Sequence, residues 1–308
     1  MSKTKVAFFG TSDRSIPILE ELHKNFDLAL CITKEDTKVG RHQNIRETQV
    51  KVWAKEHQVP YLQINNFNKE NIQNVSEQLI SSKVTIGVVA DFSLIIPKEI
   101  INIPEKKLIN VHFSLLPKYR GASPVQAAIL NGETVTGITY FVMDSGMDTG
   151  DIIGKVEYLL EGTETSEDLY KKLFSIAAEK LPEILNGYIV GNIRQETQND
   201  DIATYTSSLS HPKNTFIYKE DAKIDWSKEI NKTEQAIRAY YPWPIAWTTL
   251  EEMENNVLNI KLKENKKNST RVKIYRAHIE ENALVIDELQ VEGGKKQLWN
   301  DFKNGYVK

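Results

Sequence analysis

Short apolar runs alternate with longer amphipathic stretches over the first part of the chain. The runs are rich in β-branched residues and predict strands at residues 6–9, 28–32, 84–90, 108–113 and 138–142. Apolar residues at helical spacing predict helices at residues 16–25, 47–58, 69–81 and 124–131. Strands that alternate with helices typically form a parallel sheet, so we expect an α/β domain with a parallel-rich sheet.

The pattern changes after a predicted helix at 163–187. A polar, irregular stretch follows, and then short apolar runs predict strands at 246–250, 257–262, 272–277 and 283–289. These strands indicate a small β-rich domain, with a barrel as one arrangement. We therefore expect a first domain over 1–189, a linker over 190–205 and a second domain over 206–308.

Composition narrows the class of protein. The chain of 308 residues is 40% hydrophobic and 26% charged, which is typical of globular domains. Cys31 is its single cysteine and cannot form an internal disulfide, which favours a reducing compartment. The sequence shows neither a targeting segment at its start nor an apolar run long enough to span a membrane, so we expect a cytoplasmic protein.

The densest polar cluster, at 110–121, directly follows a predicted strand. Asn110 and His112 are two positions apart, so both lie on one face of that strand. At the carboxyl edge of a parallel sheet they would reach the crevice where such sheets bind ligands. A single histidine is more often structural, but a neighbouring asparagine and a loop bounded by proline and glycine favour a site here.

A second cluster, at 143–151, follows the next predicted strand and should lie beside the first. Its residues Asp144, Asp148 and Asp151 do not fit the spacing of a calcium-binding loop, so we expect no metal. Asp148 lies among flexible residues and is the best functional candidate of the three.

The residue types indicate a chemistry. A serine hydrolase is disfavoured because the chain has no G-x-S-x-G elbow, and classical nucleotide-binding glycine motifs are absent too. Asn, His and Asp without a metal suit acyl transfer to an external nucleophile, with Asn110 and His112 stabilising an oxyanion and Asp148 orienting the imidazole.

The chain combines the motifs Asn110-x-His112, Ser114-Leu-Leu-Pro117 and Arg120-Gly-Ala with the segment at 143–151. Together these motifs resemble one known family, the 10-formyltetrahydrofolate-dependent formyltransferases. The form of the 143–151 segment, Ile224-Asp-Trp226, the segment at 238–244 and the ending at 292–306 resemble most closely the members that act on aminoacylated tRNA. The resemblance covers nearly the whole chain.

The resemblance implies a Rossmann-like catalytic domain followed by a domain related to the OB-fold. It implies that Asn110, His112 and Asp148 are catalytic and that Ser114, Leu115, Leu116 and Pro117 line the folate site. The implied reaction moves a formyl group from 10-formyltetrahydrofolate to the α-amine of methionine on initiator tRNA. Alternatives are formylation of a small amine, such as an amino sugar nucleotide, and hydrolysis of formyltetrahydrofolate.

Charge offers separate support for an RNA partner. Residues 1–205 carry 22 basic and 27 acidic side chains, whereas residues 206–308 carry 17 and 15. The segment 261–276 holds seven basic residues against one acidic residue, which suits phosphate contacts. From it we expect tRNA contacts at Lys261, Lys263, Lys266, Lys267 and Arg271, and the resemblance adds Arg41. We expect a monomer.

Overall fold

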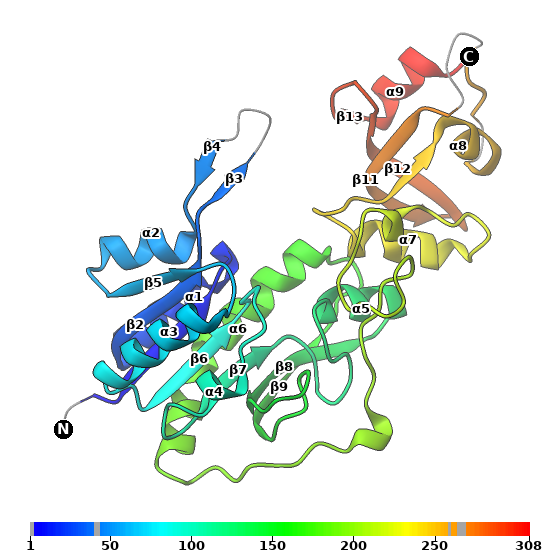
Figure 1. The fold of residues 1–308 in the computed structure, drawn as a ribbon. Helices are drawn as coiled ribbons and strands as arrows, with labels where there is room; N and C mark the ends of the chain where they lie inside the picture. The colour runs from blue at the N-terminus through cyan, green and yellow to red at the C-terminus, as the bar shows by residue number, and fades with distance from the viewer. Residues whose placement is uncertain (1–2, 40–43, 258–259, 264–268) are drawn as a thin grey trace. The chain divides into compact units, whose positions relative to one another are not determined.

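A computed structural model describes residues 3–39, 44–257, 260–263 and 269–308 (Figure 1). The chain divides into two compact units. The first comprises residues 1–120, 137–158 and 170–204, and the second comprises residues 121–136, 159–169 and 205–308. Each unit has its own sheet and its own apolar core.

The first unit is organised by a seven-stranded sheet with the order β5-β2-β1-β6-β7-β8-β9. From β5 to β7 every paired neighbour is parallel. The strands are β1 (Lys5–Gly10), β2 (Asp27–Lys34), β5 (Tyr61–Ile64), β6 (Ile86–Ala90), β7 (Leu108–His112), β8 (Val135–Val142) and β9 (Ile152–Leu159). In β1 and β6 nearly every residue is buried, as expected for central parallel strands.

Helices connect strands of this sheet, namely α1 (Ile16–Asn25), α2 (Gln49–Glu56), α3 (Lys69–Ser81) and α4 (Lys98–Ile101), and α6 (Ser166–Ile189) follows the last strand. Two of these helices have polar N-cap residues. The side chains of Thr48 and Asn68 accept hydrogen bonds from backbone N–H groups in the first turns of α2 and α3, which stabilises the helix starts. Val75 of α3 and Ile100 of α4 pack with Phe9 of β1 in one core cluster. A small hairpin, β3 (Thr37–Val39) and β4 (Asn44–Arg46), follows β2.

The second unit holds an antiparallel sheet with the order β10-β11-β12-β13. Its strands are β10 (Trp247–Thr249), β11 (Arg271–Glu280), β12 (Ala283–Val291) and β13 (Gln297–Leu298), and its helices are α5 (Pro124–Asn131), α7 (Ile230–Ala239), α8 (Leu250–Asn256) and α9 (Trp299–Tyr306). Val272 and Ile274 of β11 pack with Phe302 of α9 in its core.

The predicted α/β class, with a parallel-rich sheet and a small β-rich second domain, is confirmed. One strand direction differs from expectation, because β8 pairs antiparallel to β7. Residues 250–256 form a helix stabilised by a capping box between Thr249 and Glu252. Among the described residues, no helix combines the length and apolar character needed to cross a bilayer.

Candidate active site

Strand β7 presents Asn110 and His112 on one face of the first sheet. The strand lies between β6, which runs parallel to it, and β8, which runs antiparallel. The side chain of His112 is 7% exposed and Asn110 is partly buried, so both are held inside the fold with limited access to water. The two-residue spacing therefore places both groups on one side of the sheet, as predicted.

Asp148 faces both of these side chains. Its Oδ2 lies 3.6 Å from His112 Nδ1, and its Oδ1 lies 3.5 Å from Asn110 Nδ2. These separations are longer than the 2.7–3.2 Å of a tight N–H···O hydrogen bond. The three predicted catalytic residues thus converge, with each nitrogen facing an Asp148 oxygen at more than the distance of a tight hydrogen bond.

The orientation of the His112 ring is fixed from its other side. Its Nε2 lies 3.0 Å from the carbonyl oxygen of Tyr119, and because a carbonyl can only accept, Nε2 carries the proton. The remaining nitrogen, Nδ1, is the one that faces Asp148. When the ring is doubly protonated, Nδ1 can therefore donate to a substrate oxygen beside the carboxylate.

The loop that carries Asp148 reaches the site by a different path from the one expected. Since β8 is antiparallel, Val142 pairs with Ile109, and the strand ends beside the start of β7 and not beside its end. The chain then folds back, and the Val142 N–H donates to the Asp151 carbonyl at 2.8 Å. A Cβ at Gly150 would lie 1.8 Å from the Val142 carbonyl oxygen, so only glycine fits this turn.

Asp144 stabilises the same loop from within. Its carboxylate accepts from the Gly146 N–H at 2.9 Å and from the Thr149 hydroxyl at 2.7 Å. Its oxygens are therefore used to hold the loop, which agrees with the choice of Asp148 as the functional carboxylate. Asp148 itself has a positive φ of 54°, an uncommon conformation for a residue other than glycine.

The predicted folate-lining residues lie directly after β7. Ser114 and Leu116 are buried, whereas Leu115 and Pro117 are half-buried. Leu116 packs with Phe141 and Ile152, and its N–H donates to the Thr139 hydroxyl at 3.1 Å. Leu115 and Pro117 therefore offer more surface to a ligand than Ser114 and Leu116 do.

Two groups that could act as nucleophiles are otherwise engaged. The Ser114 hydroxyl donates to the Lys118 carbonyl at 2.6 Å, and the Ser123 hydroxyl donates to the Thr215 carbonyl at 3.2 Å. Burial raises the pKa of the Cys31 thiol to about 12, which leaves it protonated at neutral pH. The geometry therefore favours a nucleophile supplied by a substrate.

Three of the basic residues predicted to contact tRNA, namely Lys261, Lys263 and Arg271, are among the described residues, and all three belong to the second unit. Arg271 lies over the ring of Trp247, with its guanidinium carbon 4.0 Å from the ring centroid. Lys263 donates from Nζ to the Asn304 carbonyl at 2.9 Å, and the backbone carbonyl of Lys261 accepts from Lys308. Arg41, Lys266 and Lys267 lie outside the described residues.

Sequence analysis missed several residues that hold the site, namely Tyr119, Gln198 and Thr204. Tyr119 contributes a backbone carbonyl, which no side-chain pattern reveals, and Gln198 and Thr204, which contributes its hydroxyl, stand in a stretch interpreted as a linker. A single sequence contains no clear signal for any of them.

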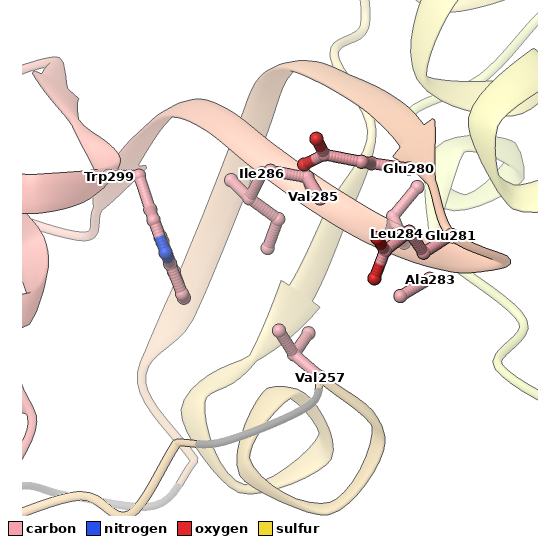
Figure 2. A pocket seen from close by; sticks show the side chains of 8 residues that line it. All are labelled: Val257, Glu280, Glu281, Ala283, Leu284, Val285, Ile286 and Trp299. Atoms are coloured by element: carbon pink, nitrogen blue, oxygen red, sulfur yellow. The ribbon is translucent and has the colours of Figure 1, made fainter.

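A pocket in the second unit is separate from this chemistry. Figure 2 shows Trp299, Ile286 and Val257 around it, with Glu280 and Glu281 at the turn between β11 and β12. None of the predicted site residues lines it.

Comparison with known proteins places the chain in a family. Residues 4–185 match the model of a formyl transferase domain, and residues 216–307 match the model of the formyl transferase C-terminal domain. A methionyl-tRNA formyltransferase of Clostridioides difficile is 34% identical over 310 residues, covering 98% of this chain and 96% of the relative.

Two solved structures share the fold. A methionyl-tRNA formyltransferase from Clostridium thermocellum has a TM-score of 0.56 at 20% identity, covering 94% of this chain and all of that one. An N-formyltransferase from Helicobacter canadensis, in complex with folinic acid and dTDP-3-aminofucose, has a TM-score of 0.60 at 19% identity, covering 96% of this chain and 100% of that one. The family models and the relative's 34% identity together show that the chain belongs to the formyl transferases and, among them, to the methionyl-tRNA formyltransferases.

Proposed function

We propose that this protein transfers the formyl group of 10-formyltetrahydrofolate to the α-amine of methionine esterified to initiator tRNA. The convergence of Asn110, His112 and Asp148 is the observation that carries the chemistry. Two N–H donors and one carboxylate, with no serine or cysteine nucleophile beside them in the described residues, suit direct transfer between two substrates.

The reaction begins when the neutral amine attacks the formyl carbon. A new N–C bond forms, and the former carbonyl oxygen becomes an oxyanion that accepts from Asn110 Nδ2 and from Nδ1 of the doubly protonated His112 ring. The attacking nitrogen then carries an extra proton, which Asp148 accepts and delivers to N10 as the C–N10 bond breaks. Atoms balance, and no covalent enzyme intermediate is required.

The proposal also specifies the formyl donor as 10-formyltetrahydrofolate. The family and the folinic acid bound by the Helicobacter canadensis relative support it. In this chain, Leu115 and Pro117 are the half-buried residues beside the catalytic strand that could contact the donor. Ser114 and Leu116 are buried, so they would act mainly by holding Leu115 and Pro117 in place.

A surface of the second unit supports an RNA acceptor. Its members are Trp247, Arg271, Lys273, Tyr275 and Lys296, which we call the outer face of the second sheet. Val272 and Ile274 are fully buried, so Arg271 and Lys273 alternate onto the opposite side of β11. Lys296 lies 4.6 Å from the centroid of the Tyr275 ring.

Cations interleaved with aromatic rings suit RNA, because cations contact phosphates and rings stack on unpaired bases. We therefore assign tRNA contacts to this face, together with the residues predicted from the sequence, which are Lys261, Lys263, Lys266, Lys267 and Arg41. A site for a small amine would not need such a face.

The test measures formyl transfer from 10-formyltetrahydrofolate to four acceptors: charged initiator tRNA, charged elongator tRNA, uncharged tRNA and a panel of amino sugar nucleotides. Rapid formylation of the charged initiator alone supports the proposal. Transfer to a sugar amine without transfer to tRNA would contradict the acceptor. Formate release in the absence of any amine would identify a hydrolase instead.

A further inference from the structure

A buried glutamine outside the predicted catalytic residues supports the Asp148 loop. Gln198 is 8% exposed, and its side-chain Nε2 lies 2.8 Å from the carbonyl oxygen of Asp148 and 2.8 Å from that of Gly150. Both carbonyls only accept, so Nε2 must donate to each. The Gln198 amide therefore holds the backbone on both sides of Thr149, next to the functional carboxylate.

The other end of the same amide is held by Arg120. The Gln198 Oε1 accepts from Arg120 Nε at 3.1 Å and from Nη2 at 2.9 Å. Arg120 is 2% exposed, and it also pairs with Asp200 at 2.7 Å. A guanidinium has only donors, so it fixes the oxygen of the amide toward itself and the nitrogen toward the loop.

The segment 196–204 reaches the histidine as well. The Thr204 hydroxyl accepts from the Tyr119 N–H at 2.8 Å, and the Thr204 carbonyl accepts from the Arg120 N–H at 2.9 Å. The carbonyl of Tyr119 is the group that accepts from His112 Nε2. One stretch of chain thus holds Asp148 through Gln198 and holds the partner of His112 through Thr204.

The two residues held in this way share an unfavourable backbone conformation. Asp148 has a φ of 54° and Tyr119 a φ of 58°. Such conformations are costly for residues with a Cβ and persist where surrounding contacts impose them. Two hydrogen bonds are contacts of that kind. Gln198 donates to the Asp148 carbonyl, and the Tyr119 N–H donates to the Thr204 hydroxyl.

We propose that the segment 196–204 is a positioning element for formyl transfer, in which Gln198 places the Asp148 carboxylate and Thr204 places the His112 ring. The inference rests on the proposed function for its kinetic consequence. Neither residue is catalytic, since each acts on the backbone of a neighbour. A misplacement of about 1 Å caused by a change away from the reacting atoms can cost about 100-fold in rate.

The first test is Gln198→Glu with Gln195→Glu as its matched control. Glutamate keeps the size of the side chain and its contact with Arg120, but it has no N–H to donate to the Asp148 and Gly150 carbonyls. Gln195 is an exposed glutamine that directly precedes this segment, so its variant adds the same charge without touching the site. We expect kcat to fall about 10- to 100-fold in Gln198→Glu alone, with the KM values for donor and acceptor changed by less than about threefold.

The second test uses Thr204→Val and Thr204→Ser. Valine keeps the shape of threonine but removes the hydroxyl that accepts from Tyr119, whereas serine keeps that hydroxyl. We expect kcat to fall in Thr204→Val and to stay close to the wild-type value in Thr204→Ser. Nitrogen NMR of the His112 ring should change in the valine variant and match the wild type in the serine variant.

The outcomes separate this inference from the proposed function. Hydrogen exchange of the 144–150 amides and the His112 ring spectrum need no substrate, so they test positioning even if methionyl-tRNA is not the acceptor. Faster exchange in Gln198→Glu supports the proposal. Wild-type kcat with unchanged exchange, or equal losses in Thr204→Val and Thr204→Ser, would overturn it. If Gln198→Glu does not fold, the threonine pair decides.

Discussion

Asp148 is the residue whose charge the mechanism uses most directly. Replacing it by asparagine keeps the shape of the side chain but removes the group that accepts the ammonium proton. We expect Asp148→Asn to lower kcat by about 10²- to 10⁴-fold, with little change in thermal stability. Steady-state kinetics and a melting curve check this. The control is Asp27→Asn, which changes a half-exposed carboxylate at the start of β2 and should keep full activity. A near-normal kcat in Asp148→Asn would exclude the proposed role of Asp148.

At the residue scale, sequence reasoning predicted the side chains that converge in the candidate site better than the residues that support them. Spacing along one strand placed Asn110 and His112 together, because strand alternation is a local rule. Asp148 was the best functional candidate of its loop from its surroundings alone, and the motif resemblance then implied a catalytic role for it. Gln198 escaped prediction because its partners are carbonyl groups about 50 residues away in sequence. Long-range contacts to backbone atoms leave no periodic pattern to read.

At the scale of elements, the turn between β8 and β9 is the most tightly constrained part of the site. Any Cβ at Gly150 meets the Val142 carbonyl oxygen, which belongs to the backbone and cannot rotate away. Gly150→Ala should therefore open the turn, displace Asp148 and lower kcat by about 10- to 100-fold, the size of a supporting-contact defect. Activity equal to wild type would show that the turn adapts without moving Asp148.

The matched control is Gly305→Ala in α9. No atom lies within 4 Å of a Cβ built there, and alanine favours a helix over glycine by about 0.5–1 kcal/mol. This variant should keep activity and gain a little stability in chemical denaturation. The two variants differ because a Cβ would clash with the backbone at Gly150 and has open space at Gly305. The glycine content of the chain does not distinguish the two positions.

Element prediction succeeded where the pattern was strong and local. The buried strands β1, β6 and β7 and the capped helix α3 were predicted within a few residues. The direction of β8 was wrong, since an apolar run has the same composition in either direction and only its partners decide. The helix α8 was not predicted, because its apolar residues are few and its capping box is the main signal.

At the scale of the whole molecule, the proposed function assigns the two substrates to surfaces that differ in charge. Residues 206–308 carry a small excess of basic side chains, and the outer face of the second sheet adds aromatic rings to them. A tRNA bound there releases counterions from its phosphates, whereas a folate makes few such contacts. The KM for charged tRNA should therefore rise steeply with KCl, while the KM for the formyl donor should stay nearly constant.

Lys273 allows a sharper version of this prediction. It pairs with Trp247 across β10 and β11, in the centre of the outer face. If it contacts one phosphate, Lys273→Ala should weaken tRNA binding and reduce the slope of log K against log salt by about 0.7–0.9. Filter binding over a range of KCl concentrations measures both. Lys155→Ala, at an exposed lysine of β9, is the control and should leave the slope unchanged. A slope equal to wild type in Lys273→Ala would move the tRNA away from this face, and the formyl transfer chemistry at Asn110, His112 and Asp148 would remain a separate question, because its residues belong to the other unit.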